Sequence, residues 1–223
     1  MVAVLVAVTI LALVALDYFV LRKRRQETTV IAETALPILA PLSDAVIHVP
    51  RGVFLQPTFT WSRLQSDGDF TVGVHPLLFG LVGPPYELML RSPGDRIEKG
   101  EPLLRIGKGD RELIVRSPMA GRVDVVNGHV VGESDWTSIA SGNGSWVYRI
   151  EPQSVSSDIA TWMVADRATD WTELQYDRLK DHLTRLTQWP EVGVTLADGG
   201  EVPTGILASL DVGAWAEIQR MFL

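Results

Sequence analysis

The sequence contains no cysteine among its 223 residues. This absence excludes disulfide bonds, thiol nucleophiles and thiolate metal sites, so the fold must be stabilised by packing alone. Histidine is scarce as well, and His48, His75, His129 and His182 are not spaced as metal-binding pairs. The chain also lacks a G-x-S-x-G nucleophile elbow and a phosphate-binding glycine loop. We therefore expect no metal site, no catalytic residues and no enzyme activity.

Basic residues are few outside one short block. The stretch Arg22-Lys23-Arg24-Arg25 holds four of the 20 basic residues. Removing that block and Asp17 from the totals of 20 basic and 27 acidic residues leaves 16 and 26, a balance of -10. A domain with this charge repels phosphate backbones, so we expect no nucleic-acid partner.

The only long apolar run lies at the start of the chain. Residues 2–21 read VAVLVAVTILALVALDYFVL, and about 20 residues suffice to cross a hydrocarbon layer of roughly 30 Å. The basic block follows this run, whereas a cleavable signal has positive charge before it. By the positive-inside rule we expect residues 1–25 to be a single-pass anchor in the inner or cytoplasmic membrane. Its N-terminus would lie outside and the globular part in the cytoplasm.

Residues 26–50 show no sustained helical or strand period and contain three prolines, so we expect an extended linker there. Residues 51–152 have the pattern of short strands separated by turns. Asp67-Gly68, between two strand-like segments, predicts a hairpin in which glycine adopts a positive φ. Further turns are expected at residues 93–95, 108–110 and 117–121. This pattern predicts a mainly β domain, either a sandwich or a partly open barrel.

Residues 153–223 change to a helical pattern. Apolar residues recur at three- and four-residue spacing from Ile159 to Leu186, which predicts one long or two consecutive amphipathic helices. A short helix is expected after Asp211, a residue type that favours the N-cap position. We therefore expect a helical C-terminal extension on the β domain.

A series of short motifs occurs in the β region: Thr71-Val72-Gly73-Val74, Gly83, Pro93-Gly94-Asp95, Glu98-Lys99-Gly100-Glu101, Ser117-Pro118-Met119-Ala120-Gly121-Arg122-Val123, Asn127 and Trp146. In order and spacing they resemble the H protein of the glycine cleavage system, without a gap from Gly73 to Asn127. The resemblance implies a lipoyl-like barrel-sandwich hybrid, formed by two small sheets packed face to face. The whole chain would then be a divergent, membrane-anchored member, mainly β, with C-terminal helices and one N-terminal transmembrane helix.

The resemblance also implies where a cofactor would be attached. In this family a lysine at a hairpin tip, within an E-S-x-K-A segment, is acylated by lipoate. The gapless overlay places Gly107-Lys108-Gly109-Asp110-Arg111 at that segment, with Asp110 at the lysine position. A carboxylate cannot form the lipoyl amide, so we expect no lipoyl cofactor. The alternative is a shifted hairpin that presents Lys108 instead.

These observations favour a non-catalytic accessory or scaffolding subunit that covers the cytoplasmic face of a photosynthetic, respiratory or transport complex. Its partners would be the other subunits of that complex and membrane lipid. One alternative is a membrane-bound lipoate carrier that uses Lys108. Another is an adaptor of an export system, but such adaptors place the domain outside the cytoplasm and contain a coiled-coil hairpin, which residues 61–150 lack.

Overall fold

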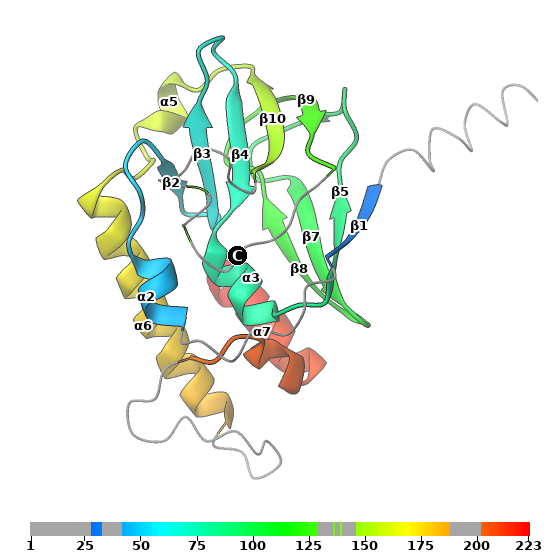
Figure 1. Ribbon diagram of the computed structural model, residues 1–223, viewed down its shortest axis with the longest axis vertical. Helices are drawn as coiled ribbons and strands as arrows, with labels where there is room; N and C mark the ends of the chain where they lie inside the picture. Colours follow the sequence, from blue (N-terminus) through cyan, green and yellow to red (C-terminus); the bar gives the residue numbers. More distant parts are fainter. Residues whose placement is uncertain (1–27, 33–41, 129–135, 137–138, 140–145, 188–201) are drawn as a thin grey trace, which may run out of the picture.

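The computed structural model describes residues 28–32, 42–128, 136, 139, 146–187 and 202–223. Two antiparallel sheets form the body of the described part, with helices around them (Figure 1). The four-stranded sheet has the order β1 (Thr28–Ala32), β5 (Tyr86–Leu90), β7 (Pro102–Lys108) and β8 (Arg111–Arg116). The six-stranded sheet has the order β2 (Phe54–Gln56), β3 (Thr60–Leu64), β4 (Phe70–Val74), β10 (Trp146–Pro152), β9 (Gly121–Val126) and β6 (Arg96–Ile97). The predicted mainly β fold is confirmed.

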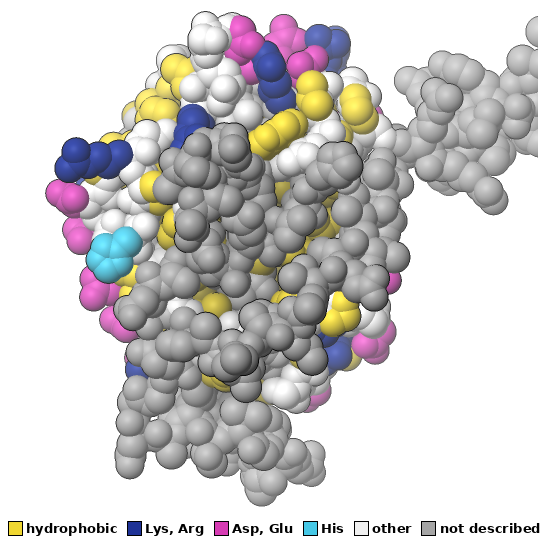
Figure 2. Space-filling model, in the orientation of Figure 1, with side chains coloured by type: hydrophobic (Ala, Val, Ile, Leu, Met, Phe, Trp, Pro, Cys, Tyr) yellow, Lys and Arg dark blue, Asp and Glu magenta, His cyan; other side chains and the backbone are white. Residues whose placement is uncertain are grey.

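The hairpin predicted at Asp67-Gly68 joins β3 to β4. Gly68 has a φ of 95°, and the Asp67 carboxylate accepts a hydrogen bond from the Asp69 N–H at 3.2 Å. Both aspartates of this turn also pair with Arg149 of β10. Figure 2 accordingly shows acidic and basic side chains lying together over the β3–β4 hairpin, at the top of the view.

The two sheets pack face to face over one large hydrophobic core, to which both contribute alternate residues of their strands. A hydrogen bond also links them. Tyr148 of β10 is buried, and its hydroxyl donates to the Leu103 carbonyl of β7 at 3.0 Å and accepts from the Arg91 N–H at 2.8 Å. Because this hydroxyl is removed from water, the pKa of Tyr148 is raised.

Helices lie beside the sheets and at the end opposite the β3–β4 hairpin (Figure 1): α2 (Leu42–Ile47), α3 (Pro76–Val82), α5 (Ser156–Ile159), α6 (Asp166–Thr187), the 3-10 helix η1 (Ile206–Ser209) and α7 (Val212–Phe222). Helix α6 confirms the predicted amphipathic helix from residue 166 onward. Residues 160–165 were expected to be helical and are not, because Met163 instead forms a β-bridge with Leu55. The short helix after Asp211 is confirmed, and the Asp211 carboxylate caps it by accepting from the Ala214 N–H at 2.8 Å.

Helix α3 begins at a fully buried histidine. His75 Nδ1 accepts a hydrogen bond from the Leu77 N–H at 3.1 Å. Its Nε2 lies 3.3 Å from the Thr172 hydroxyl of α6, and that hydroxyl donates to the Ala168 carbonyl. Nε2 therefore carries the proton of a neutral imidazole. Burial lowers the pKa of His75 to about 3.

Helix α7 covers the outer edge of β8. The Gln219 side chain accepts from the Ile114 N–H at 2.6 Å and donates to the Ile114 carbonyl at 3.1 Å. Trp215 and Ile218 of the same helix are buried in the main core. The C-terminal helix is therefore part of the same folded body as the sheets.

The segment expected to be an extended linker differs from that expectation. Within residues 26–50, β1 pairs along its whole length with β5, and α2 places Leu42 and Val46 in the main core. The sequence pattern missed these elements because each is short and depends on partners far along the chain. The proposed anchor, residues 1–25, lies outside the described residues. Within the described ranges, no helix combines the length and apolar character that a membrane span requires.

Candidate functional site

The candidate site is the tip of the β7–β8 hairpin, where the sequence places Asp110. Lys108 and Arg111 form the last pair of the ladder, so Gly109 and Asp110 make a two-residue turn as predicted. Gly109 has a φ of 68° at the first central position, where a type II′ turn requires glycine. The Asp110 side chain is 83% exposed, and its carboxylate lies 3.7 Å from Arg111 Nε. The tip therefore presents an acidic group to solvent.

Lys108, the alternative attachment residue, is held against the end of α3. Its Nζ lies 2.7 Å from the Gly83 carbonyl, 3.2 Å from that of Val82 and 3.3 Å from that of Pro84. A cation at a helix C-terminus also interacts favourably with the helix dipole. Partial burial, followed by the charge of Arg111, lowers the pKa of Lys108. The amine thus binds the protein's own backbone.

Arg111 fixes the other side of the tip. Its Nη1 donates to the carbonyls of Leu210 and Ala208, at 2.6 and 3.2 Å, where η1 ends. The guanidinium also lies over the Trp215 ring of α7, 5.6 Å from the ring centroid. Both residues that flank the turn are therefore bound to helices outside the sheet.

The supporting helices are themselves in close contact. The Gly205 N–H donates to the Gly80 carbonyl at 2.7 Å. A Cβ atom at Gly83 would lie 2.5 Å from the Gly205 Cα, and Gly83 has a positive φ of 62°. Glycine is thus required where the end of α3 meets the start of η1. Lys108 binds the α3 side of this junction, and Arg111 binds the other end of η1.

The remaining motif residues stabilise turns and strand ends away from the tip. Gly94 has a φ of 90° in the predicted turn, where the Asp95 carboxylate accepts from the Ser92 N–H at 3.0 Å. The buried Ser117 hydroxyl donates to the Met119 carbonyl at 2.7 Å, and the Asn127 amide donates to the Trp146 carbonyl at 2.9 Å. None of these contacts places a nucleophile or a general base beside Asp110.

The histidines do not come together as a site. His48 is exposed. His75 is buried at the N-cap of α3 and His182 is buried on α6, while His129 lies outside the described residues. In the described part of the chain, no three metal-binding side chains are grouped. The backbone contacts of Lys108 and Arg111 were not predicted, since their partners lie 24 to 26 and 97 to 99 residues away.

The family model and the curated relatives give one family. The family model described as glycine cleavage H-protein matches residues 53–174, just over half of the chain. Glycine cleavage system H protein 2 of Pseudomonas syringae is 24% identical over 113 residues, which is 51% of this chain and 88% of that protein. The H protein of Methylococcus capsulatus is 23% identical over 108 residues, 48% of this chain and 84% of the relative. The crystal structure of a glycine cleavage system H protein from Mycobacterium marinum has a TM-score of 0.44 and 19% identity, covering 56% of this chain and 99% of that one.

Proposed function

This chain belongs to the glycine cleavage H-protein family, and from that premise we propose that it is a static, non-acylated member serving as an accessory subunit of a membrane complex. Proteins of this family are carriers rather than catalysts, which agrees with the expectation that the chain is not an enzyme. The proposal assigns it neither a substrate nor a cofactor. Its role would be to bind other subunits.

The observation that carries the proposal is the hairpin tip. A mobile lipoyl arm needs an amine that projects into solvent, and the tip presents the carboxylate of Asp110 instead. The nearest amine, Lys108, is held by three backbone carbonyls. Releasing it would leave those carbonyls without their charged donor, which costs free energy. A hairpin fixed on both sides suits a rigid binding surface better than a swinging arm.

The membrane part of the proposal comes from the sequence. The apolar residues 2–21 and the basic block after them favour a single-pass anchor with the folded domain in the cytoplasm. Only six residues separate this run from β1, so the domain would lie close to the bilayer. The proposed partners are other subunits of an integral membrane complex and membrane lipid.

Acylation is tested by intact-mass measurement of the full chain from cells that lipoylate their own proteins, with a co-expressed glycine cleavage H protein as the positive control. We expect the control to gain one lipoyl group and this chain to stay unmodified. A lipoyl group on this chain would refute the proposal.

The second candidate function is a lipoate carrier that uses Lys108. The lowered pKa of Lys108 favours it, because acylation requires the deprotonated amine. This candidate predicts that any added lipoyl mass disappears in Lys108→Arg and persists in Lys99→Arg, a control at an exposed lysine away from the hairpin tip.

The scaffolding role is tested separately. Membranes are washed with alkaline carbonate, extracted with mild detergent and analysed by native mass spectrometry. We expect the chain to resist the wash and to appear in an assembly of fixed stoichiometry. A chain released by carbonate contradicts the anchor, and a monomer after mild extraction contradicts the scaffold.

A further inference from the structure

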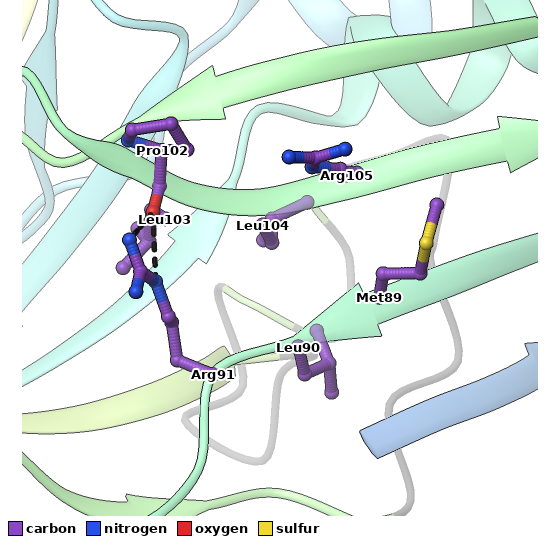
Figure 3. Close-up of a pocket in the computed structure, with 7 residues that line it drawn as sticks. All are labelled: Met89, Leu90, Arg91, Pro102, Leu103, Leu104 and Arg105. Atoms are coloured by element: carbon purple, nitrogen blue, oxygen red, sulfur yellow. Dashed lines mark hydrogen bonds between the residues drawn. The ribbon is translucent and has the colours of Figure 1, made fainter. Parts of the chain in front are cut away.

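A hollow of about 150 Å³ lies between β5 and β7, on the four-stranded sheet (Figure 3). Met89 and Arg91 line it from the β5 side, and Pro102 and Arg105 from the β7 side. A water molecule occupies about 30 Å³ of liquid, so the hollow has room for a group of several heavy atoms. It is distinct from the hairpin tip, which lies at the other end of β7.

The hollow exists because the strands separate at this end. Leu90 and Leu104 are the last pair of the β5–β7 ladder. The next pair would join Arg91 and Leu103, but the Tyr148 hydroxyl lies between their backbone groups and bonds to both. The spacing is therefore fixed by a buried side chain of the other sheet.

Two guanidinium groups supply the polar lining of the hollow. In Figure 3 the Arg91 side chain reaches the Pro102 carbonyl, to which its Nε and Nη2 donate at 3.0 and 2.9 Å. Arg105 uses Nη1 to bind Glu112 at 3.3 Å. A guanidinium has five N–H donors, so both arginines have donors left for a ligand. Arg91 also lies 4.0 Å from the Glu101 carboxylate, so each of the two guanidinium groups is paired with one glutamate at the rim of the hollow.

The start of β1 lies at the same end of the four-stranded sheet as this hollow. Thr28, the first residue of β1, pairs with Leu90, the residue before Arg91. The six residues between the apolar run and Thr28 span at most roughly 20 Å when extended. Four of these six residues are the basic block. The hollow is thus within reach of lipid headgroups if residues 2–21 cross the bilayer.

We propose that this hollow binds the phosphate group of an anionic phospholipid headgroup, with Arg91 and Arg105 as the donors. The inference rests on the proposed membrane anchor and adds a specific lipid contact to it. The rest of the domain is acidic and is repelled by an anionic surface, so a local site of this kind would orient the four-stranded sheet toward the bilayer.

The test uses the full chain in a neutral detergent and counts bound molecules by native mass spectrometry. The probes are dihexanoyl phosphatidylglycerol, dihexanoyl phosphatidylcholine and inorganic phosphate. We expect one phosphatidylglycerol per chain, bound more tightly than either other probe. Arg105→Gln should weaken it about fivefold, the effect of about 1 kcal/mol for one basic residue near a membrane surface.

Arg122→Gln is the matched control, since Arg122 is also an exposed arginine paired with one glutamate but lies on the other sheet. It should leave lipid binding unchanged. Equal losses in the two variants, no bound phosphatidylglycerol, or inorganic phosphate binding as tightly as the lipid would each overturn the proposal. If the chain stays in carbonate-washed membranes but binds phosphatidylglycerol no more tightly than the other probes, the headgroup site is refuted and the anchor is not. If the carbonate wash releases the chain, the anchor is refuted.

Discussion

Acidification should destabilise this protein through His75. The imidazole is fully buried and neutral, and its pKa is about 3 in the folded chain, against an ordinary value of 6.5 in the unfolded chain. Between these two pH values the unfolded chain binds a proton that the folded chain does not. Stability from this residue is therefore complete above pH 6.5 and falls as the pH decreases toward 3.

The size of the effect follows from the same two values. Each pH unit below 6.5 costs about 1.4 kcal/mol, so moving from pH 7 to pH 5 should remove about 2 kcal/mol of the free energy of unfolding. Protonation would also remove the acceptor for the Leu77 N–H, which starts α3. The loss is a large fraction of the 5–15 kcal/mol typical of a domain.

The assay is urea unfolding of the full chain in non-ionic detergent at pH 7 and pH 5, followed by tryptophan fluorescence. His75→Asn keeps a side-chain acceptor at the N-cap but does not titrate, so its stability should change about 2 kcal/mol less between the two pH values than that of the wild type. His48→Asn alters an exposed histidine and should keep the wild-type pH dependence. If His75→Asn shows the same pH dependence as the wild type, the reasoning is wrong.

Three further substitutions test the contacts that hold the fold. Tyr148→Phe should lower the free energy of unfolding by about 1–3 kcal/mol in urea titrations, because it leaves the Arg91 N–H and the Leu103 carbonyl without their partner. An unchanged free energy of unfolding would argue against this link between the sheets. Lys108→Met should lower the free energy of unfolding by about 1–2 kcal/mol, which is less than the loss of three buried charged hydrogen bonds because the ammonium is only partly buried. Amide hydrogen exchange should become faster at the end of α3, and unchanged exchange there would contradict the proposed role of Lys108 in holding that end. Asp211→Ala should cost about 1 kcal/mol by removing the N-cap of α7, measured as a thermal shift, with Asp211→Asn retaining most of the stability.

Local features of the fold could be predicted from the sequence. The turn at Asp67-Gly68 and the N-cap at Asp211 depend on residues a few positions apart, and both occur where the pattern predicts them. Strand β1 and helix α2 could not be predicted in the same way. Each has only five or six residues, and each owes its position to partners elsewhere in the chain, such as Leu90 for Thr28.

In the candidate site, too, local features could be predicted from the sequence and long-range contacts could not. The two-residue turn that presents Asp110 follows from the local pattern and the family spacing. The contacts of Lys108 and Arg111 do not, because their carbonyl partners belong to α3, η1 and the loops beside them. Backbone carbonyls occur at every residue, so the sequence gives no sign of which ones will bind Lys108 and Arg111. These contacts could be identified only from the three-dimensional structure.

Strand edges are where β proteins are most prone to recruit foreign chains, since unpaired N–H and carbonyl groups act as a template for another strand. At β8 the amide of Gln219 occupies both backbone groups of Ile114, in the middle of the strand. The Gln219 side chain thus makes the two hydrogen bonds that a neighbouring strand would make at Ile114. A peptide that added to this edge as a strand would have to break both bonds. Gln219→Ala should free these two backbone groups and produce concentration-dependent oligomers, measured by size-exclusion chromatography.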